Sequence, residues 1–396
     1  MTEPPRGPSK VTPYQPPTLA PAISEDPSTR FARHFFTVFI LKNDFAVASL
    51  DVDTITSSFQ TSPSLHHAII AIGALSLSKR VPARRKDNVL RALASYRTAL
   101  LESQKALQEQ DVRPNDSGLW NSFFLGLFEL MLDSTGESWL KHILFGTSKM
   151  LQVRGPQAHV AGPGRAFFLT IRVFEICRSL IYSDATFLMD NEWKAVMGRM
   201  WEDEFSREWH PKEDMLDLMI ECSGVWDIID PDSRHPPRLL DKRLVTLAAH
   251  GLHIQSFLLT WHSSFLAGLS RNQFASLSPQ SQLAALYYHA TSIFLDGIFS
   301  YRSQFDRHSS PTLPREAIQD HVSNILTRTK LALETTNLAG VLFFFPLRVA
   351  GARAILLAQQ ELILELLREI SNREFVVAEA FREDLKNLWH QRSISI

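Results

Sequence analysis

Cysteine and surplus positive charge are both scarce in this sequence, and each shortage excludes a class of protein. Only Cys177 and Cys222 occur among 396 residues. Two thiols so far apart fit a reducing compartment, and they cannot supply the four ligands of a structural zinc site. The 41 Lys and Arg residues are balanced by 42 Asp and Glu residues. Because binding to DNA phosphates needs surplus cations, this balance argues against direct DNA binding.

Long apolar runs are also missing. The most apolar stretch, residues 338–347, is about half of the ~20 residues that a membrane span requires. It is followed by Arg348 and Arg353, and no apolar segment follows a basic start as in a secretory signal peptide. We therefore expect a soluble intracellular protein with no membrane contact.

Glycine and proline are distributed as in a helical protein with an N-terminal tail. Glycine contributes only 16 residues, and eight of the 21 prolines fall within residues 1–28. That segment has almost no large apolar side chain, so it cannot bury enough surface to offset its ordering entropy. We expect a disordered Pro-rich tail at 1–28. Residues 29–396 have the composition of one large globular domain.

Apolar side chains early in the domain recur at helical spacing. Ser62 and Pro63 predict a helix start. The apolar stripe that follows consists of Leu65, Ala68, Ile69, Ile72 and Leu75. A second helix, 88–110, is expected to bury Leu90, Leu93, Tyr96, Leu100 and Leu107. The third, 117–132, is apolar nearly all round and is expected at the centre of the core.

The clearest helix boundaries come next. Ser134 and Glu137 have the spacing of a capping box, and Gly155 followed by Pro156 is typical of a helix C-terminus. One face of this helix would hold Trp139, Ile143, Gly146 and Met150.

The second half of the chain continues with helical patterns. Helices are expected near 165–182, 190–205, 212–228, 239–268, 279–302, 314–337, 340–370 and 373–391. Ser371 and Glu374 are expected to form a capping box at the start of the last one. No run alternates as a strand does, so the predicted fold is all-α, a large domain of packed antiparallel helices.

The segment from Phe124 to Pro156 resembles the signature of the fungal-specific transcription factor domain. Residues 62–78 and 343–351 are similar to flanking motifs of that family, so the resemblance spans residues 60–390. The central motif residues are Glu129-Leu130, Trp139-Leu140-Lys141-His142, Gly146 and Arg154-Gly155-Pro156. Interpreted from their chemistry, these residues are packing anchors and a helix stop, and none is catalytic.

This resemblance implies a nuclear transcriptional regulator that shuttles with the cytoplasm or stays in the nucleus. Members of the family usually carry six cysteines that bind two zinc ions and read the DNA major groove. Here no cysteine precedes Cys177. We therefore expect a regulator without its own zinc cluster, which acts through a DNA-binding partner or the transcription machinery and controls a gene cluster of secondary metabolism. An incomplete gene with a missing first exon is the other explanation.

Several polar groups suggest chemistry but have simpler explanations. His250 and His253 lie one helical turn apart, without a carboxylate to complete a metal site. Asp227, Asp230 and Asp232 would suit Mg²⁺, and they suit a turn equally well. The basic run from Lys79 to Lys86 is interpreted as a solvated inter-helix loop, with nuclear import or phosphate contact as the alternative. We therefore assign no catalytic, cofactor-binding or metal-binding residue.

The 26 phenylalanines leave a second hypothesis open. Clusters such as Phe343-Phe344-Phe345 fill a helical core or line an apolar cavity for a small metabolite. An enzyme of small-molecule biosynthesis would reuse such a cavity, with acidic residues such as Asp227 and Asp230 at its mouth. The regulator remains the leading hypothesis, and the enzyme is the alternative.

Overall fold

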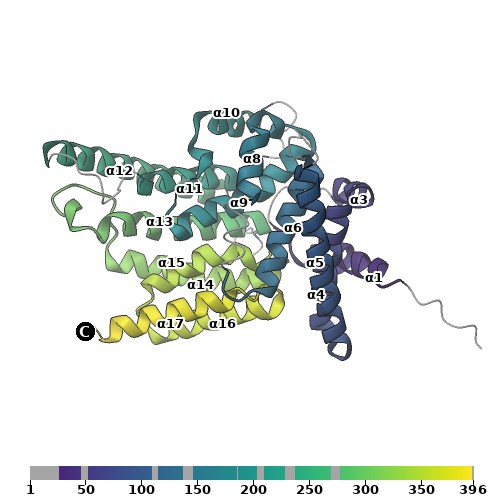
Figure 1. The fold of residues 1–396 in the computed structure, drawn as a ribbon. Helices are drawn as coiled ribbons and strands as arrows, with labels where there is room; N and C mark the ends of the chain where they lie inside the picture. The colour runs from purple at the N-terminus through teal and green to yellow at the C-terminus, as the bar shows by residue number, and fades with distance from the viewer. Residues whose placement is uncertain are drawn as a thin grey trace, which may run out of the picture.

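Every regular element in the described part of this chain is helical (Figure 1). The computed structural model describes residues 26–45, 52–108, 115–136, 146–184, 186–202, 209–227, 237–268 and 277–394. The predicted all-α fold is confirmed. Most of the predicted tail lies outside these residues, but its end is wrong, because Asp26 caps a helix that begins at Pro27. No described helix is both long and apolar enough to cross a membrane.

The N-terminal helices form an upright group on the right of Figure 1, in which α4 contacts α1, α5 and α6. The predicted cap is confirmed, because Ser62 Oγ accepts a hydrogen bond from the Leu65 N–H at 3.4 Å. The elements of this group are α1 (Pro27–His34), which runs through a π-helical segment (Phe35–Phe39) into α2 (Ile40–Lys42), α3 (Val52–Thr61), α4 (Pro63–Arg80), α5 (Arg85–Gln108) and α6 (Asp116–Leu132).

The middle and C-terminal helices form two further layers (Figure 1). The upper one holds α8 (Ser148–Arg154), α9 (Gly162–Tyr182), α10 (Asn191–Arg199), α11 (Pro211–Asp227), α12 (Pro237–Gly268) and α13 (Pro279–Ser300). The lower one holds α14 (Arg315–Thr335), α15 (Phe344–Arg353), α16 (Leu357–Arg373) and α17 (Ala378–Ile394). Short 3-10 turns lie at Pro82–Arg84, Pro156–His159, Phe187–Met189, Ser303–Phe305 and Gly340–Phe343.

The predicted buried face of the second helix is only partly confirmed. Tyr96 and Leu100 are half-buried and pack against the core, and the Leu107 side chain lies outside the described residues. Leu90 and Leu93 are 57% and 38% exposed, whereas the smaller Ala92 and Ala99 are fully buried. Helix α5 packs mainly along α4, and alanines allow two helices to approach more closely than leucines do. Close approach of α5 to the neighbouring helix therefore favours the alanines at the contact, and Leu90 and Leu93 remain exposed.

The predicted helix over 340–370 is also wrong, because it is two helices. Ala354 and Leu356 adopt extended backbone between α15 and α16. The sequence has no glycine or proline at this break, which one long-range contact and one local capping contact stabilise instead. The Arg353 carbonyl accepts from the Gln319 side chain at 3.0 Å, and Gln359 Oε1 accepts from the Leu356 N–H at 3.2 Å.

The capping box predicted at Ser371 and Glu374 does not form. Ser371 lies inside α16, and Glu374 ends that helix, so α17 begins only at Ala378. The Glu374 carboxylate instead accepts a hydrogen bond from Ser76 Oγ on α4 at 2.9 Å. A Ser-x-x-Glu pattern also occurs at helix ends. Here Glu374 ends α16 and bonds to Ser76 on another helix.

Glu374 is the centre of a buried polar cluster that joins the first and last helices. Since Ser76 donates its proton to Glu374, the Nε2 of His34 donates to Ser76 Oγ at 3.1 Å. Burial, with the nearby Arg80 and Lys42, lowers the pKa of His34 to about 4, so the imidazole is neutral. The Lys79 ammonium donates to the Glu374 carbonyl oxygen at 2.7 Å.

The predicted helix stop at Gly155 is confirmed. Helix α8 ends at Arg154, and Gly155 has φ 85°, a left-handed backbone that side chains with a Cβ rarely adopt. The capping box at Ser134 and Glu137, and the Trp139 motif, involve residues 137–145, which lie outside the described residues.

Gly73 generates a stability prediction, because α1 crosses α4 at this residue. A Cβ at Gly73 would lie 2.1 Å from the carbonyl oxygen of Phe31. We expect Gly73→Ala to reduce the free energy of unfolding by about 2 kcal/mol, as overpacking does. Gly198→Ala is the matched control, because nothing lies within 4 Å of its Cβ; its stability should stay unchanged or rise by up to about 1 kcal/mol. Equal urea midpoints for the two variants would contradict this prediction.

Candidate functional site

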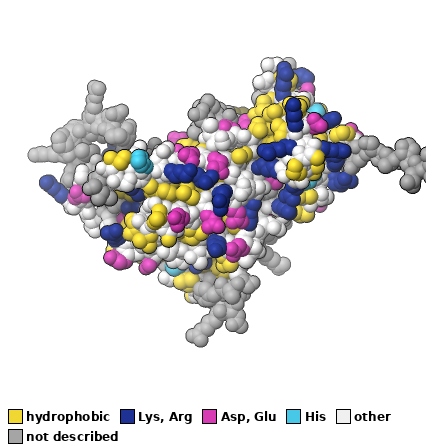
Figure 2. Space-filling model, turned by 90° about the horizontal axis from the view of Figure 1, so that it is seen from below, with side chains coloured by type: hydrophobic (Ala, Val, Ile, Leu, Met, Phe, Trp, Pro, Cys, Tyr) yellow, Lys and Arg dark blue, Asp and Glu magenta, His cyan; other side chains and the backbone are white. Residues whose placement is uncertain are grey.

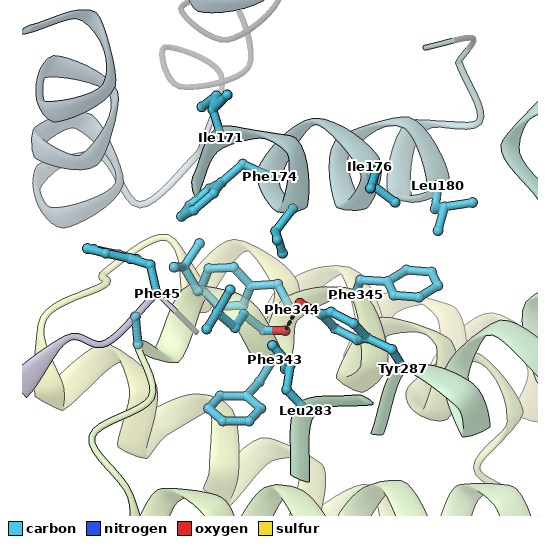
Figure 3. Close-up of a cluster of buried hydrophobic side chains, with 14 of the residues drawn as sticks. Phe45, Ile171, Phe174, Ile176, Leu180, Leu283, Tyr287, Phe343, Phe344 and Phe345 are labelled. Atoms are coloured by element: carbon cyan, nitrogen blue, oxygen red, sulfur yellow. Dashed lines mark hydrogen bonds between the residues drawn. The ribbon is translucent and has the colours of Figure 1, made fainter. Parts of the chain in front are cut away.

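An apolar cavity of about 220 Å³ lies where α6, α9, α15 and α17 meet. Its wall combines side chains that are far apart in the sequence: Leu130, Val173, Phe174, Val341, Phe344, Val377 and Phe381. Figure 3 shows Phe174 and Phe344 within the buried cluster beside it. A cavity of roughly 150 Å³ with such a lining already holds a benzene ring, so this one is large enough for a small apolar molecule.

Most of the cavity wall is apolar, and its polar lining consists of Thr135, Tyr182, the pair Arg348 and Asp384, and the thiol of Cys177. Its Sγ lies 3.7 Å from the Tyr287 hydroxyl, which donates to the Leu342 carbonyl oxygen at 3.3 Å (Figure 3). Burial raises the pKa of the Cys177 thiol to about 12. Because the thiolate is the nucleophile, a thiol held in this state is unsuited to covalent catalysis.

An ion pair lies at the edge of the cavity. Arg348 Nη1 is 3.3 Å from Asp384 Oδ2, and the Arg348 guanidinium lies over the Phe381 ring at 5.9 Å. Arg348, Phe381 and Asp384 also line a second hollow of about 440 Å³ along α15 and α17. Both charged side chains are substantially exposed, at 39% and 64%. The two side chains form a polar rim. Because water can solvate both charges, separating them leaves no buried charge unpaired.

The buried charges of α9 and α11 form closed networks away from this cavity. Arg172 pairs with Glu213, and Lys212 Nζ lies 2.8 Å from Glu213 Oε1. Burial and the nearby Arg172 lower the pKa of Lys212 to about 7. On α9, Glu175 accepts from Arg178 at 2.8 Å. These ion pairs join α9 to α11 and fix residues within α9. The sequence did not predict them, because it does not show which charged residues are brought together by folding.

A histidine pair joins α13 and α14. The Nδ1 atoms of His289 and His321 are 2.8 Å apart, so one ring donates a hydrogen bond and the other accepts it. Burial lowers the pKa of His289 to about 2 and that of His321 to about 4, with His262 contributing to both and Arg328 to His289. The pair is therefore neutral at physiological pH, as this hydrogen bond requires.

The two histidines predicted to lie on one helix have different neighbours. His250 lies 4.0 Å from Glu221, and His253 packs edge-on against Phe257. Asp230 and Asp232 lie outside the described residues, as does the side chain of Asp227. Among the described residues, no group of three or more His, Cys, Asp or Glu side chains is arranged to hold a metal ion.

The described residues form an all-helical domain with an apolar cavity between its helices. The family model of the fungal specific transcription factor domain matches residues 31–394. The chain belongs to this family. Membership supports a transcriptional regulator and favours a non-catalytic role.

Comparisons with other proteins and with solved structures give one partial match and no structural match. An uncharacterized protein of Emericella nidulans is 33% identical over 101 residues, which is 26% of this chain and 21% of that protein. The match thus spans about a fifth of the relative's length. No solved structure matches.

The histidine pair generates a prediction about pH. The folded-state pKa of His321, about 4, lies below its ordinary value of 6.5. The unfolded chain therefore binds protons first, so this contribution to stability is present above pH 6.5 and is lost as the pH falls below it. We expect His321→Asn, whose side-chain oxygen replaces Nδ1, to reduce the loss of unfolding free energy between pH 7 and pH 5 by on the order of 1 kcal/mol.

Urea denaturation at the two pH values measures this difference. His250→Asn, a partly exposed histidine on α12, is the control and should leave the loss unchanged. Identical losses for wild type and His321→Asn would show that the pair does not sense pH.

Proposed function

We propose that this chain is a nuclear transcriptional regulator that responds to a small apolar molecule and reaches DNA through a partner protein. The cavity between α6, α9, α15 and α17 carries the first part of the proposal. The balanced charge, 41 cations against 42 anions, supports the second, because a phosphate-binding surface needs surplus cations. Control of a gene cluster for secondary metabolism is the expectation we attach to it.

The chemistry of the cavity supports ligand sensing better than catalysis. Its wall is apolar, and its thiol is held protonated by burial. The ion pair at its edge, Arg348 with Asp384, is exposed and has no buried base or acid beside it in the cavity lining. A site of this kind binds by shape and apolar contact, as ligand pockets commonly do.

Filling the cavity should weaken ligand binding. Ala380 lines it, so Ala380→Phe places a ring in its space. With the apolar fluorophore N-phenyl-1-naphthylamine as probe, we expect about tenfold weaker binding in a fluorescence titration, since a ligand of that size loses its contacts. Ala94→Phe, the same substitution at an exposed residue of α5, should bind as wild type. Equal affinities of the two variants would place the probe elsewhere.

The transcriptional part needs a genetic test. Deleting the gene should change transcript levels of neighbouring genes, measured by RNA sequencing, and the Ala380→Phe allele should abolish any response of those transcripts to the small molecule. Unchanged transcripts together with altered metabolites would favour the enzyme hypothesis instead and would contradict this proposal.

A further inference from the structure

A hollow of about 650 Å³ lies on the surface where the C-terminal end of α4 meets α5, α6 and the segment before α17. Its floor is apolar and includes Leu75, Val89, Leu90, Met131, Leu132 and Val376. Leu90 and Leu132 are 57% and 41% exposed. We call this surface the α4–α5 groove. Single exposed leucines are common on this protein, as at Leu101 and Leu259. Leu90 and Leu132 differ because they line one hollow together with other apolar side chains, and such a contiguous patch marks a candidate binding surface.

Cations surround the α4–α5 groove. Arg85 and Lys86 line it together with Lys79, whose ammonium is bonded to the Glu374 carbonyl oxygen. Arg84 belongs to the same run, as does Arg80, which lies 3.7 Å from Glu374 Oε1. Residues 79–87 thus carry five cations and a single carboxylate, Asp87. Figure 2 shows apolar side chains ringed by Lys and Arg on this end of the molecule. The rest of the chain is close to neutral overall, so this local excess of positive charge is a property of the groove.

We propose that the α4–α5 groove docks an acidic amphipathic helix of a partner protein. The apolar floor suits leucine-like side chains at the i, i+3, i+4 and i+7 positions of a helix. The cations at the rim suit carboxylates on the flanks of the same helix, because opposite charges across an interface steer and orient the partner.

Other occupants fit less well. Nucleic acid would use the cations but not the apolar floor, because its backbone is a row of phosphates. A planar membrane surface would contact apolar side chains that protrude, whereas these lie in a hollow. A single-headed amphiphile would neutralise only one or two charges of a run that holds five cations. A helix presents several carboxylates along its length and also fills the hollow.

The α4–α5 groove and the apolar cavity share a wall. Met131 and Val376 line the groove, while their chain neighbours Leu130 and Val377 line the cavity. The Val377 N–H donates to the Leu130 carbonyl oxygen at 3.2 Å, which joins the two segments. The proposed docking itself does not depend on the proposed function. Its interpretation as the surface through which a regulator contacts its partner does rest on that function.

Peptide binding tests the proposal on the full chain. The probe is a fluorescein-labelled amphipathic peptide of roughly four helical turns, with Leu at the four anchor positions and Glu on both flanks. We expect saturable binding by fluorescence anisotropy, weakened about tenfold or more by Leu90→Asp or Arg85→Glu, as for anchors of an interface. Added salt should also weaken binding. The same peptide with Lys in place of Glu should not bind.

Matched variants separate docking from folding. Leu101→Asp changes a leucine of α5 that is 47% exposed outside the groove, and Lys330→Glu reverses an exposed charge on α14. Both should bind the peptide as wild type, and circular dichroism should show all four variants folded. Equal binding of the Glu and Lys peptides, or loss of binding in the control variants, would overturn the proposal. Leu90-dependent binding of phosphatidylserine vesicles without binding of the peptide would do so too.

The outcomes also distinguish this inference from the proposed function. Groove-dependent peptide binding with unchanged transcripts in the deletion strain would retain the docking surface and overturn the regulatory function. Altered transcripts with no peptide binding would retain the function and overturn the docking surface.

Discussion

The contact between Ser76 and Glu374 is the constraint on which the arrangement of layers depends. It joins α4 to the end of α16, 298 residues further along the chain. Glu374 is 3% exposed, so its carboxylate must be satisfied by Ser76 and the nearby cations. A buried carboxylate that loses its partners is costly, so the first and last helices are held in one register. The apolar cavity lies within the space that this register defines.

Local signals predicted some of the helix boundaries that the chain itself supplies, but missed the cap at Asp26. Ser62 with Pro63, and Gly155 with Pro156, act within a turn of the residues that they cap. The break after Arg353 has no such signal, because Gln319 on another helix stabilises it. The role of Glu374 was missed for the same reason. Helix boundaries that depend on long-range contacts cannot be predicted from the local sequence pattern.

The sequence did not predict which residues line the cavity, although it contains the aromatic clusters that suggested one. The aromatic clusters suggested a cavity, but its wall combines Leu130, Val173, Phe344 and Val377 from four separate segments. The prediction for α5 failed at Leu90. Leu90 has a core-forming side chain at core spacing and still lies 57% exposed. The helical pattern predicted burial for Leu90 and did not predict that this residue lines a surface hollow.

The shared wall formed by residues 130–131 and 376–377 has a thermodynamic consequence. These backbones are one layer thick, and a hydrogen bond links them. In our proposals the cavity takes a small apolar molecule and the groove takes a helix of a partner protein. Free-energy linkage is reciprocal, so any effect of one occupant on the affinity for the other is returned by the same factor. The shortest path for such an effect runs through the adjacent residues of this wall.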